Sequence, residues 1–112
     1  MAVVNQYKFY GITVTAAETA TLLSPNVNET IIIKSIRLGN LSGSNKPVIT
    51  LKDNNIALFN AQELDHNASL ELLTQPLIIE GGTTFTYTTS GTVSGGVAVG
   101  ISYLNIKKEK ID

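Results

Sequence analysis

The sequence contains no cysteine and no tryptophan, and it has only one histidine. Without cysteine, neither a disulfide framework nor a thiolate metal site can form, so packing and backbone hydrogen bonds must stabilise the fold. The single histidine, His66, lies in a run of Asp65 and Asn67, and the sequence has neither a nucleophile motif nor a second cluster of ligands. We therefore expect no catalytic residue, no metal site and no cofactor, and we expect that the protein is not an enzyme.

Charge is also scarce: 15% of the residues are charged, against about 25% in an average protein. The formal net charge is −1, and the only basic cluster is Lys107, Lys108 and Lys110. Since nucleic-acid binding needs a basic face, we expect no nucleic-acid partner. No apolar run approaches the roughly 20 residues that cross a bilayer, and residues 1–6 do not resemble a signal peptide. We expect synthesis in a cytoplasm and no membrane partner.

Short runs of β-branched and aromatic residues, separated by turn residues, fill the chain. Asn60–Leu73 alone has apolar residues near helical spacing, but Asp65-His66-Asn67 interrupts it, which favours a loop and a short strand. About eight strands at this spacing predict one domain over residues 1–112, an all-β, two-sheet antiparallel β-sandwich that is jelly-roll or Greek-key-like. The expected strand segments are Tyr7–Thr15, Thr19–Ser24, Thr30–Asn40, Val48–Lys52, Ile56–Phe59, Ser69–Leu73, Leu77–Glu80, Thr83–Ser90 and Val97–Ile106.

The longest apolar segment changes phase partway along. Ile31 and Ile33 share one face of a strand, whereas Ile36 and Leu38 fall on the other. Either both faces are buried or one extra residue shifts the register, and we favour a β-bulge near Lys34-Ser35.

Two further breaks have local causes. Asp53-Asn54-Asn55 predicts a tight hairpin, because asparagine tolerates the positive φ angles that such turns need. Gln75-Pro76 marks a sheet edge or corner, since proline cannot donate a hydrogen bond to a strand ladder.

From Gly81 to Ile106 there is no charged side chain. Two expected strands lie in this stretch, and alternation places their bulky residues on the core side. Their opposite sides carry small, uncharged residues, which could form a solvated threonine ladder, contact a neighbouring subunit or bind a ligand. Removing water from an uncharged surface costs little free energy, so contact with a neighbouring subunit is the functional interpretation that we favour. The candidate subunit-contact face is Thr84, Thr86, Thr88, Ala98, Gly100 and Ser102.

The second half also resembles a known family. Ser69–Leu73, Gln75–Phe85 and Val97–Leu104 are similar to segments of small β-sandwich virion structural proteins of tailed bacteriophages, especially marine phages. Thr30–Asn40 and the following loop and strand agree with the strand-loop-strand unit of that family. The resemblance implies a place in the virion, in capsid decoration or in the neck or tail, and supplies no catalytic residue.

Two functions follow as hypotheses. The first is a virion structural protein that acts by protein–protein packing, with other capsid or tail proteins as partners, and that forms a homo-oligomer. The second is a carbohydrate- or receptor-binding β-sandwich module of a tail fibre, which predicts exposed tyrosine on a concave face with asparagine and aspartate in the adjoining loops.

Overall fold

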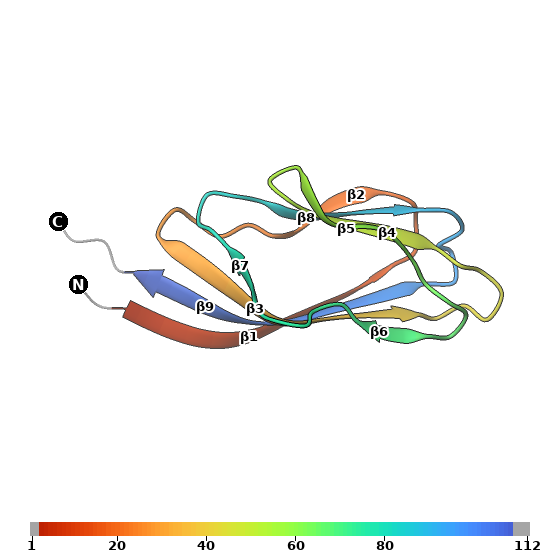
Figure 1. Cartoon of the computed structure of the whole chain (residues 1–112), viewed down its shortest axis with the longest axis horizontal. Coiled ribbons are helices and arrows are strands. Elements are labelled where there is room, and N and C mark those ends of the chain that lie inside the picture. Colours follow the sequence, from red (N-terminus) through yellow and green to blue (C-terminus); the bar gives the residue numbers. More distant parts are fainter. Residues whose placement is uncertain (1–2, 109–112) are drawn as a thin grey trace.

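The computed structural model describes residues 3–108, and this part of the chain folds into nine strands and no helix. The strands form two stacked antiparallel sheets (Figure 1), so the predicted β-sandwich is confirmed. Sheet A contains β1 (Val3–Val14), β9 (Val97–Lys108), β3 (Glu29–Asn40), β6 (Ser69–Glu71) and β7 (Leu77–Ile79). Sheet B contains β2 (Thr19–Leu23), β8 (Phe85–Ser90), β4 (Val48–Asp53) and β5 (Ile56–Glu63).

The strand order has jelly-roll topology. Sheet A runs β1-β9-β3-β6, with β7 also paired to β3, and sheet B runs β2-β8-β4-β5. Strands β6 and β7 lie along the same edge of β3 on either side of the Gln75-Pro76 break, so together they take the place of one strand. The eight strands of a jelly roll thus become nine, and the predicted edge position of Pro76 follows from this split.

Apolar residues from both sheets meet between the layers and form the core. The bulky faces predicted for the last two strands lie there: Phe85 and Tyr87 from β8, and Val99 and Ile101 from β9, are all buried. Each sheet therefore has one face toward the core and one outer face, and the outer faces are available for function.

The predicted β-bulge is present in β3. Its register with β9 shifts between Ile33 and Ser35, and Ile33 and Ile36 are both fully buried. One extra residue thus returns both halves of this long strand to the core.

The predicted hairpin between β4 and β5 is also confirmed. Asp53 pairs with Ile56, so the loop consists of Asn54 and Asn55, whose φ angles are 50° and 72°. Two positive φ angles in a two-residue loop match a type I′ turn, which suits the twist of the flanking strands.

Several strand ends differ from the sequence prediction. β1 begins at Val3 and β9 continues to Lys108, because the two strands pair with each other along their whole length. Backbone pairing thus extends the two strands through the polar residues Asn5-Gln6 and Lys107-Lys108, which gave no strand signal. The described residues include no helix that is long and apolar enough to span a bilayer. Lys110 lies outside the described residues.

Candidate functional site

The six residues of the predicted contact face do not form one surface. Thr84, Thr86 and Thr88 lie in or next to β8 on the outer face of sheet B, whereas Ala98, Gly100 and Ser102 lie on the outer face of sheet A. The two groups are therefore on opposite sides of the sandwich. Alternation within a strand correctly gave the outward side of each triplet, but it carries no information about which sheet a strand joins.

On sheet B, the threonine hydroxyls are partly used within the sheet itself. Thr88 lies opposite Thr19, and their Oγ1 atoms are 2.9 Å apart. Thr86 lies opposite Lys52, which brings a charge onto this face. Thr50 Oγ1 accepts a hydrogen bond of 3.0 Å from the amide of Ala61. The outer face of sheet B thus carries a threonine ladder whose hydroxyl groups make contacts within the sheet and which has one lysine beside it.

The outer face of sheet A is hollowed instead. A shallow groove of about 510 Å³ crosses strands β1, β9 and β3. Its floor consists of small residues in register, since Gly11 lies opposite Gly100 and Ala98 lies opposite Gly39. We call this surface the glycine groove; the residues that form it are Phe9, Gly11, Ile12, Thr13, Ser35, Arg37, Leu38, Gly39, Ser69, Ala98, Val99, Gly100 and Ser102.

Phe9 lies over the floor of the glycine groove, and its side chain is 71% exposed. A Cβ atom on Gly11 would come within 2.8 Å of Phe9 Cε2, and one on Gly100 within 3.2 Å of Phe9 Cε1. A side chain at Gly11 would displace the phenyl ring and one at Gly100 would crowd it, so the two glycines let the ring lie close to the sheet. The ring has glycine below it and solvent above it.

Arg37 of β3 is charged and lines the glycine groove. Glu71 of β6 lies opposite Arg37, next to the groove. The Glu71 carboxylate accepts hydrogen bonds from the Ser35 hydroxyl and from the amides of Ile36, at 2.8 Å, and Leu73, at 3.2 Å. Burial would raise the pKa of Glu71, but these hydrogen bonds and the nearby Arg37 outweigh it and lower the pKa. Glu71 thus stays ionised and ties β6 to the bulge of β3.

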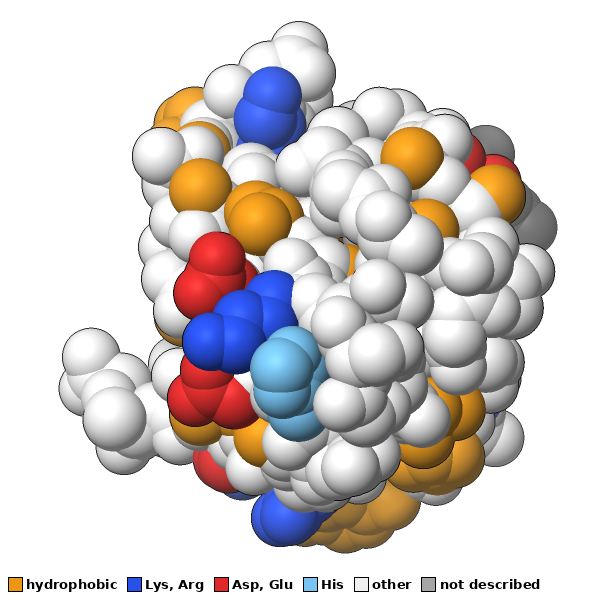
Figure 2. Space-filling view, turned by 90° about the vertical axis from the view of Figure 1, so that its right-hand side faces the viewer, with side chains coloured by type: hydrophobic (Ala, Val, Ile, Leu, Met, Phe, Trp, Pro, Cys, Tyr) orange, Lys and Arg blue, Asp and Glu red, His pale blue; other side chains and the backbone are white. Residues whose placement is uncertain are grey.

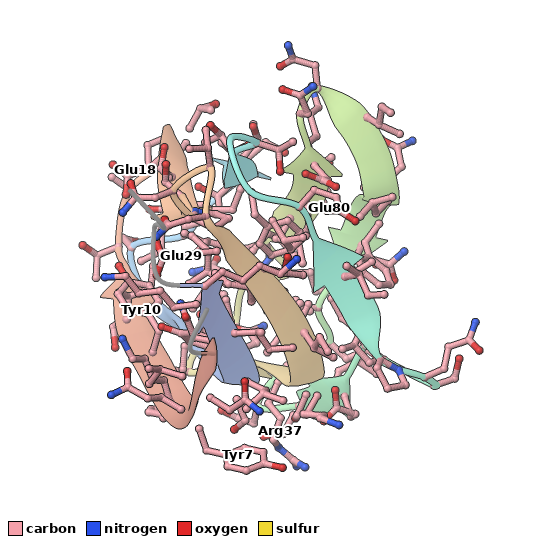
Figure 3. The ribbon with its side chains drawn as sticks, turned by 90° about the vertical axis from the view of Figure 1, so that its left-hand side faces the viewer. Tyr7, Tyr10, Glu18, Glu29, Arg37 and Glu80 are labelled. Carbon is pink, nitrogen blue, oxygen red and sulfur yellow. The ribbon has the colours of Figure 1, made fainter. Side chains whose placement is uncertain are left out.

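An apolar row extends the groove toward the start of β1. Tyr7 lies opposite Leu104, which lies opposite Ile32, which lies opposite Ile78, so the row crosses the whole sheet. Tyr7 is 80% exposed and Ile78 is 53% exposed. Figure 3 shows Tyr7 and Arg37 together along the lower margin of the view, on the outer side of sheet A. The outer face of sheet A therefore combines a small-residue floor with exposed apolar side chains.

The loop end of the sandwich has a different character. Figure 2 shows a mostly uncharged surface with scattered charges, and one group of acidic and basic side chains lies next to the histidine. Lys46 Nζ and Asp65 Oδ1 form an exposed ion pair of 3.6 Å, and His66, the next residue in the chain, is also exposed. Among residues 3–108, no three histidine, aspartate or glutamate side chains are arranged to hold a metal ion.

Sequence reasoning found three of the groove residues, Ala98, Gly100 and Ser102, and missed those that other strands contribute. Phe9 comes from β1 and Arg37 from β3, both far from β9 in the chain, and Tyr7 of β1 lies beside the groove. The alternation of β1 could have placed Tyr7 and Phe9 on one face together. However, β1 and β3 pair with β9 because of the sheet topology. The alternation of side chains along a single strand does not reveal which strands pair.

Comparison with known proteins adds little. The sequence matches no protein-family profile and no curated protein. Among solved structures, the chain is similar to one from the cyanophage Pam1 capsid asymmetric unit, with 16% identity and a TM-score of 0.44 over 95% of this chain and 85% of that one. It is also similar to a family 35 carbohydrate-binding module from Clostridium thermocellum, with 11% identity and a TM-score of 0.39 over 95% and 98% of the two chains. With TM-scores this low, neither likeness supports a functional conclusion.

Proposed function

We propose that this protein is a non-catalytic structural component of a tailed-phage virion, and that it acts by packing the outer face of sheet A against neighbouring virion proteins. The finer role is capsid decoration or attachment at the neck or tail. The protein would be made in the host cytoplasm and then join the particle. The outer surface of sheet A supports the packing role, whereas the sequence resemblance supports the place in a virion.

The observation that carries the proposal is the glycine groove with its exposed aromatic neighbours. Single exposed apolar residues are ordinary, but Tyr7 and Phe9 lie on the same face of one strand, beside a groove floored by glycine and alanine. A backbone or side chain of a neighbour can approach such a floor closely. The low charge also reduces the cost of removing water from this face.

A pair of lysine substitutions tests this role, because the structure places the two sites on opposite faces. Ser102→Lys introduces a charge beside the glycine groove, whereas Thr86→Lys introduces one on the threonine ladder, next to Lys52. We expect Ser102→Lys to be lost from purified particles, because an unpaired charge would be buried at the contact. Thr86→Lys should be retained at the level of the unmodified protein.

Mass spectrometry of intact particles gives the readout, and thermal unfolding of each purified variant shows that both still fold. Absence of the unmodified protein from particles would overturn the virion role. Normal incorporation of Ser102→Lys would show that the groove faces water in the assembly.

Carbohydrate or receptor binding is a second candidate, favoured by the exposed rings of Tyr7 and Phe9 beside a concave surface. Serine and threonine hydroxyls border the same groove and could hydrogen-bond to a sugar. Screening the protein on a glycan array tests this candidate. Binding that disappears in Phe9→Ala would favour it over packing, and the absence of any glycan signal would count against it.

A further inference from the structure

The edges of the two sheets differ in how well they are protected against pairing with another chain. β6 and β7 have three residues each, and β2 has five with a register shift. β5 has eight residues, with two register shifts against β4. Short length and irregular register are common ways to prevent unwanted strand addition. Four of the edge strands in the described part of the chain are therefore protected.

β1 is the exception. It has twelve residues, it pairs with β9 without a register shift, and its other side has no partner strand among residues 3–108. It contains no proline and one charged residue, Lys8. Such a strand presents a long, regular row of unpaired backbone groups, which is a template for another strand.

We propose that β1 pairs in antiparallel fashion with β1 of a second copy of this chain, around a two-fold axis that passes beside Phe9. The inference deepens the proposed packing function by naming one partner. Pairing would join two copies of sheet A into one continuous sheet and bury the free edge of each. A two-fold contact of this kind is closed, so it produces a dimer and not a fibre.

The register follows from length and charge. A two-fold axis perpendicular to the sheet keeps outward residues opposite outward residues, so the axis must pass beside one residue of β1. Centring on Lys8 or on Phe9 gives the longest overlap of Val3–Val14, eleven positions in either case. Centring on Lys8 would place two lysines directly opposite each other, which is destabilising. Centring on Phe9 avoids this.

The side chains also fit the register centred on Phe9. Tyr7 of the second copy would lie opposite Gly11, next to the Phe9 ring that already covers this glycine. An aromatic residue across from a glycine compensates for the missing side chain. On the other side of the sheet, Lys8 would lie opposite Tyr10, where a cation can contact an aromatic ring. Tyr7 and Phe9, the two most exposed apolar residues of β1, thus each gain a partner.

Joining the two copies would double the area of the outer face of sheet A on which neighbouring proteins can pack. The two glycine grooves would lie on the same side of one joined sheet, related by the two-fold axis. The exposed aromatic residues of β1 would be covered at its centre.

The absence of cysteine allows a direct test of the register by disulfide formation. We would make Tyr7→Cys, Lys8→Cys and Phe9→Cys separately, oxidise each full-length protein at low concentration, and measure its mass. With the axis beside Phe9, the two Phe9→Cys sulfurs face each other, and the 12.0 kDa species should convert to one of twice that mass. The paired cysteines of Lys8→Cys would be about 8 Å apart, and those of Tyr7→Cys about 14 Å, which is too far for a disulfide.

Analytical ultracentrifugation of the unmodified protein accompanies this test, and we expect a dimer. A charge swap provides a matched control: Phe9→Lys and Phe9→Glu should each be monomeric alone and should form a mixed dimer when combined. Cross-linking of Lys8→Cys or Tyr7→Cys in place of Phe9→Cys would overturn the register. A monomeric unmodified protein with no cross-link at any position would overturn the dimer.

These outcomes are separable from those for the proposed function. A monomer that still joins phage particles overturns the dimer and leaves the packing role intact. A dimer that is absent from particles overturns the virion role and leaves the dimer intact.

Discussion

At the residue scale, a single carboxylate organises the edge of sheet A next to the glycine groove. Glu71 accepts hydrogen bonds from Ser35, Ile36 and Leu73, and so it fixes both the bulge of β3 and the end of β6. The bulge in turn brings Ile36 back to the core. One acidic side chain thereby links the outer surface to interior packing.

We predict that Glu71→Gln destabilises the fold by about 1 kcal/mol at neutral pH, because charge-assisted hydrogen bonds to backbone amides are replaced by weaker ones at an exposed site. The folded-state pKa of Glu71 is lowered from its ordinary value of 4.5. Its contribution is therefore fully present above pH 4.5 and is lost as the pH falls through the folded-state pKa.

Urea unfolding of the two proteins at several pH values measures this difference. It should be largest near neutral pH and should shrink in acid. Glu80→Gln, at another exposed glutamate, is the control and should behave like the unmodified protein. A difference between Glu71→Gln and the unmodified protein that does not change with pH would show that lost packing, and not the charge, is the cause.

At the element scale, short-range patterns predicted the strands but did not indicate which strands pair with each other. The bulge of β3 followed from the phase of four apolar residues, and the β4–β5 hairpin followed from two asparagines. In both cases the sequence pattern lies within a few residues of the bulge or turn that it predicts. By contrast, the sequence prediction placed the uncharged residues of β8 and β9 on one candidate contact face. The two strands belong to different sheets. Pairing between strands that are distant in the chain decides which sheet each strand joins. For this reason the six residues of the predicted contact face lie on two opposite surfaces.

The hairpin offers a test of such a local signal. Asn55 has a φ angle of 72°, which a β-branched residue adopts only at a cost. Asn55→Val should therefore lower the free energy of unfolding by about 1–2 kcal/mol. Asn55→Gly should retain or slightly raise it, because glycine adopts this conformation freely.

Chemical denaturation of both variants provides the measurement. Equal stability of the valine and glycine variants would mean that the loop changes its conformation to accommodate valine.

At the scale of the whole molecule, the unusual property is how little charge the surface carries. Packing through the outer face of sheet A would depend on apolar contact and close approach, and not on attraction between charges. Between about 0.1 M and 1 M salt, the screening length falls from about 10 Å to about 3 Å, so contacts that depend on charge weaken.

We therefore expect association of this protein with its particle to be insensitive to salt over that range. Co-sedimentation of the purified protein with particles that lack it would measure the association. Release at high salt would indicate that charged residues such as Arg37, or the lysines at the end of β9, make the contact instead.

The position of β9 also affects when the molecule can fold. β9 lies between β1 and β3 in sheet A, although it comes last in sequence among the strands of residues 3–108. During synthesis, β1 and β3 would emerge from the ribosome early and wait without the strand that joins them. Because such distant pairings form slowly, half of the sandwich would be completed only after translation has passed Lys108.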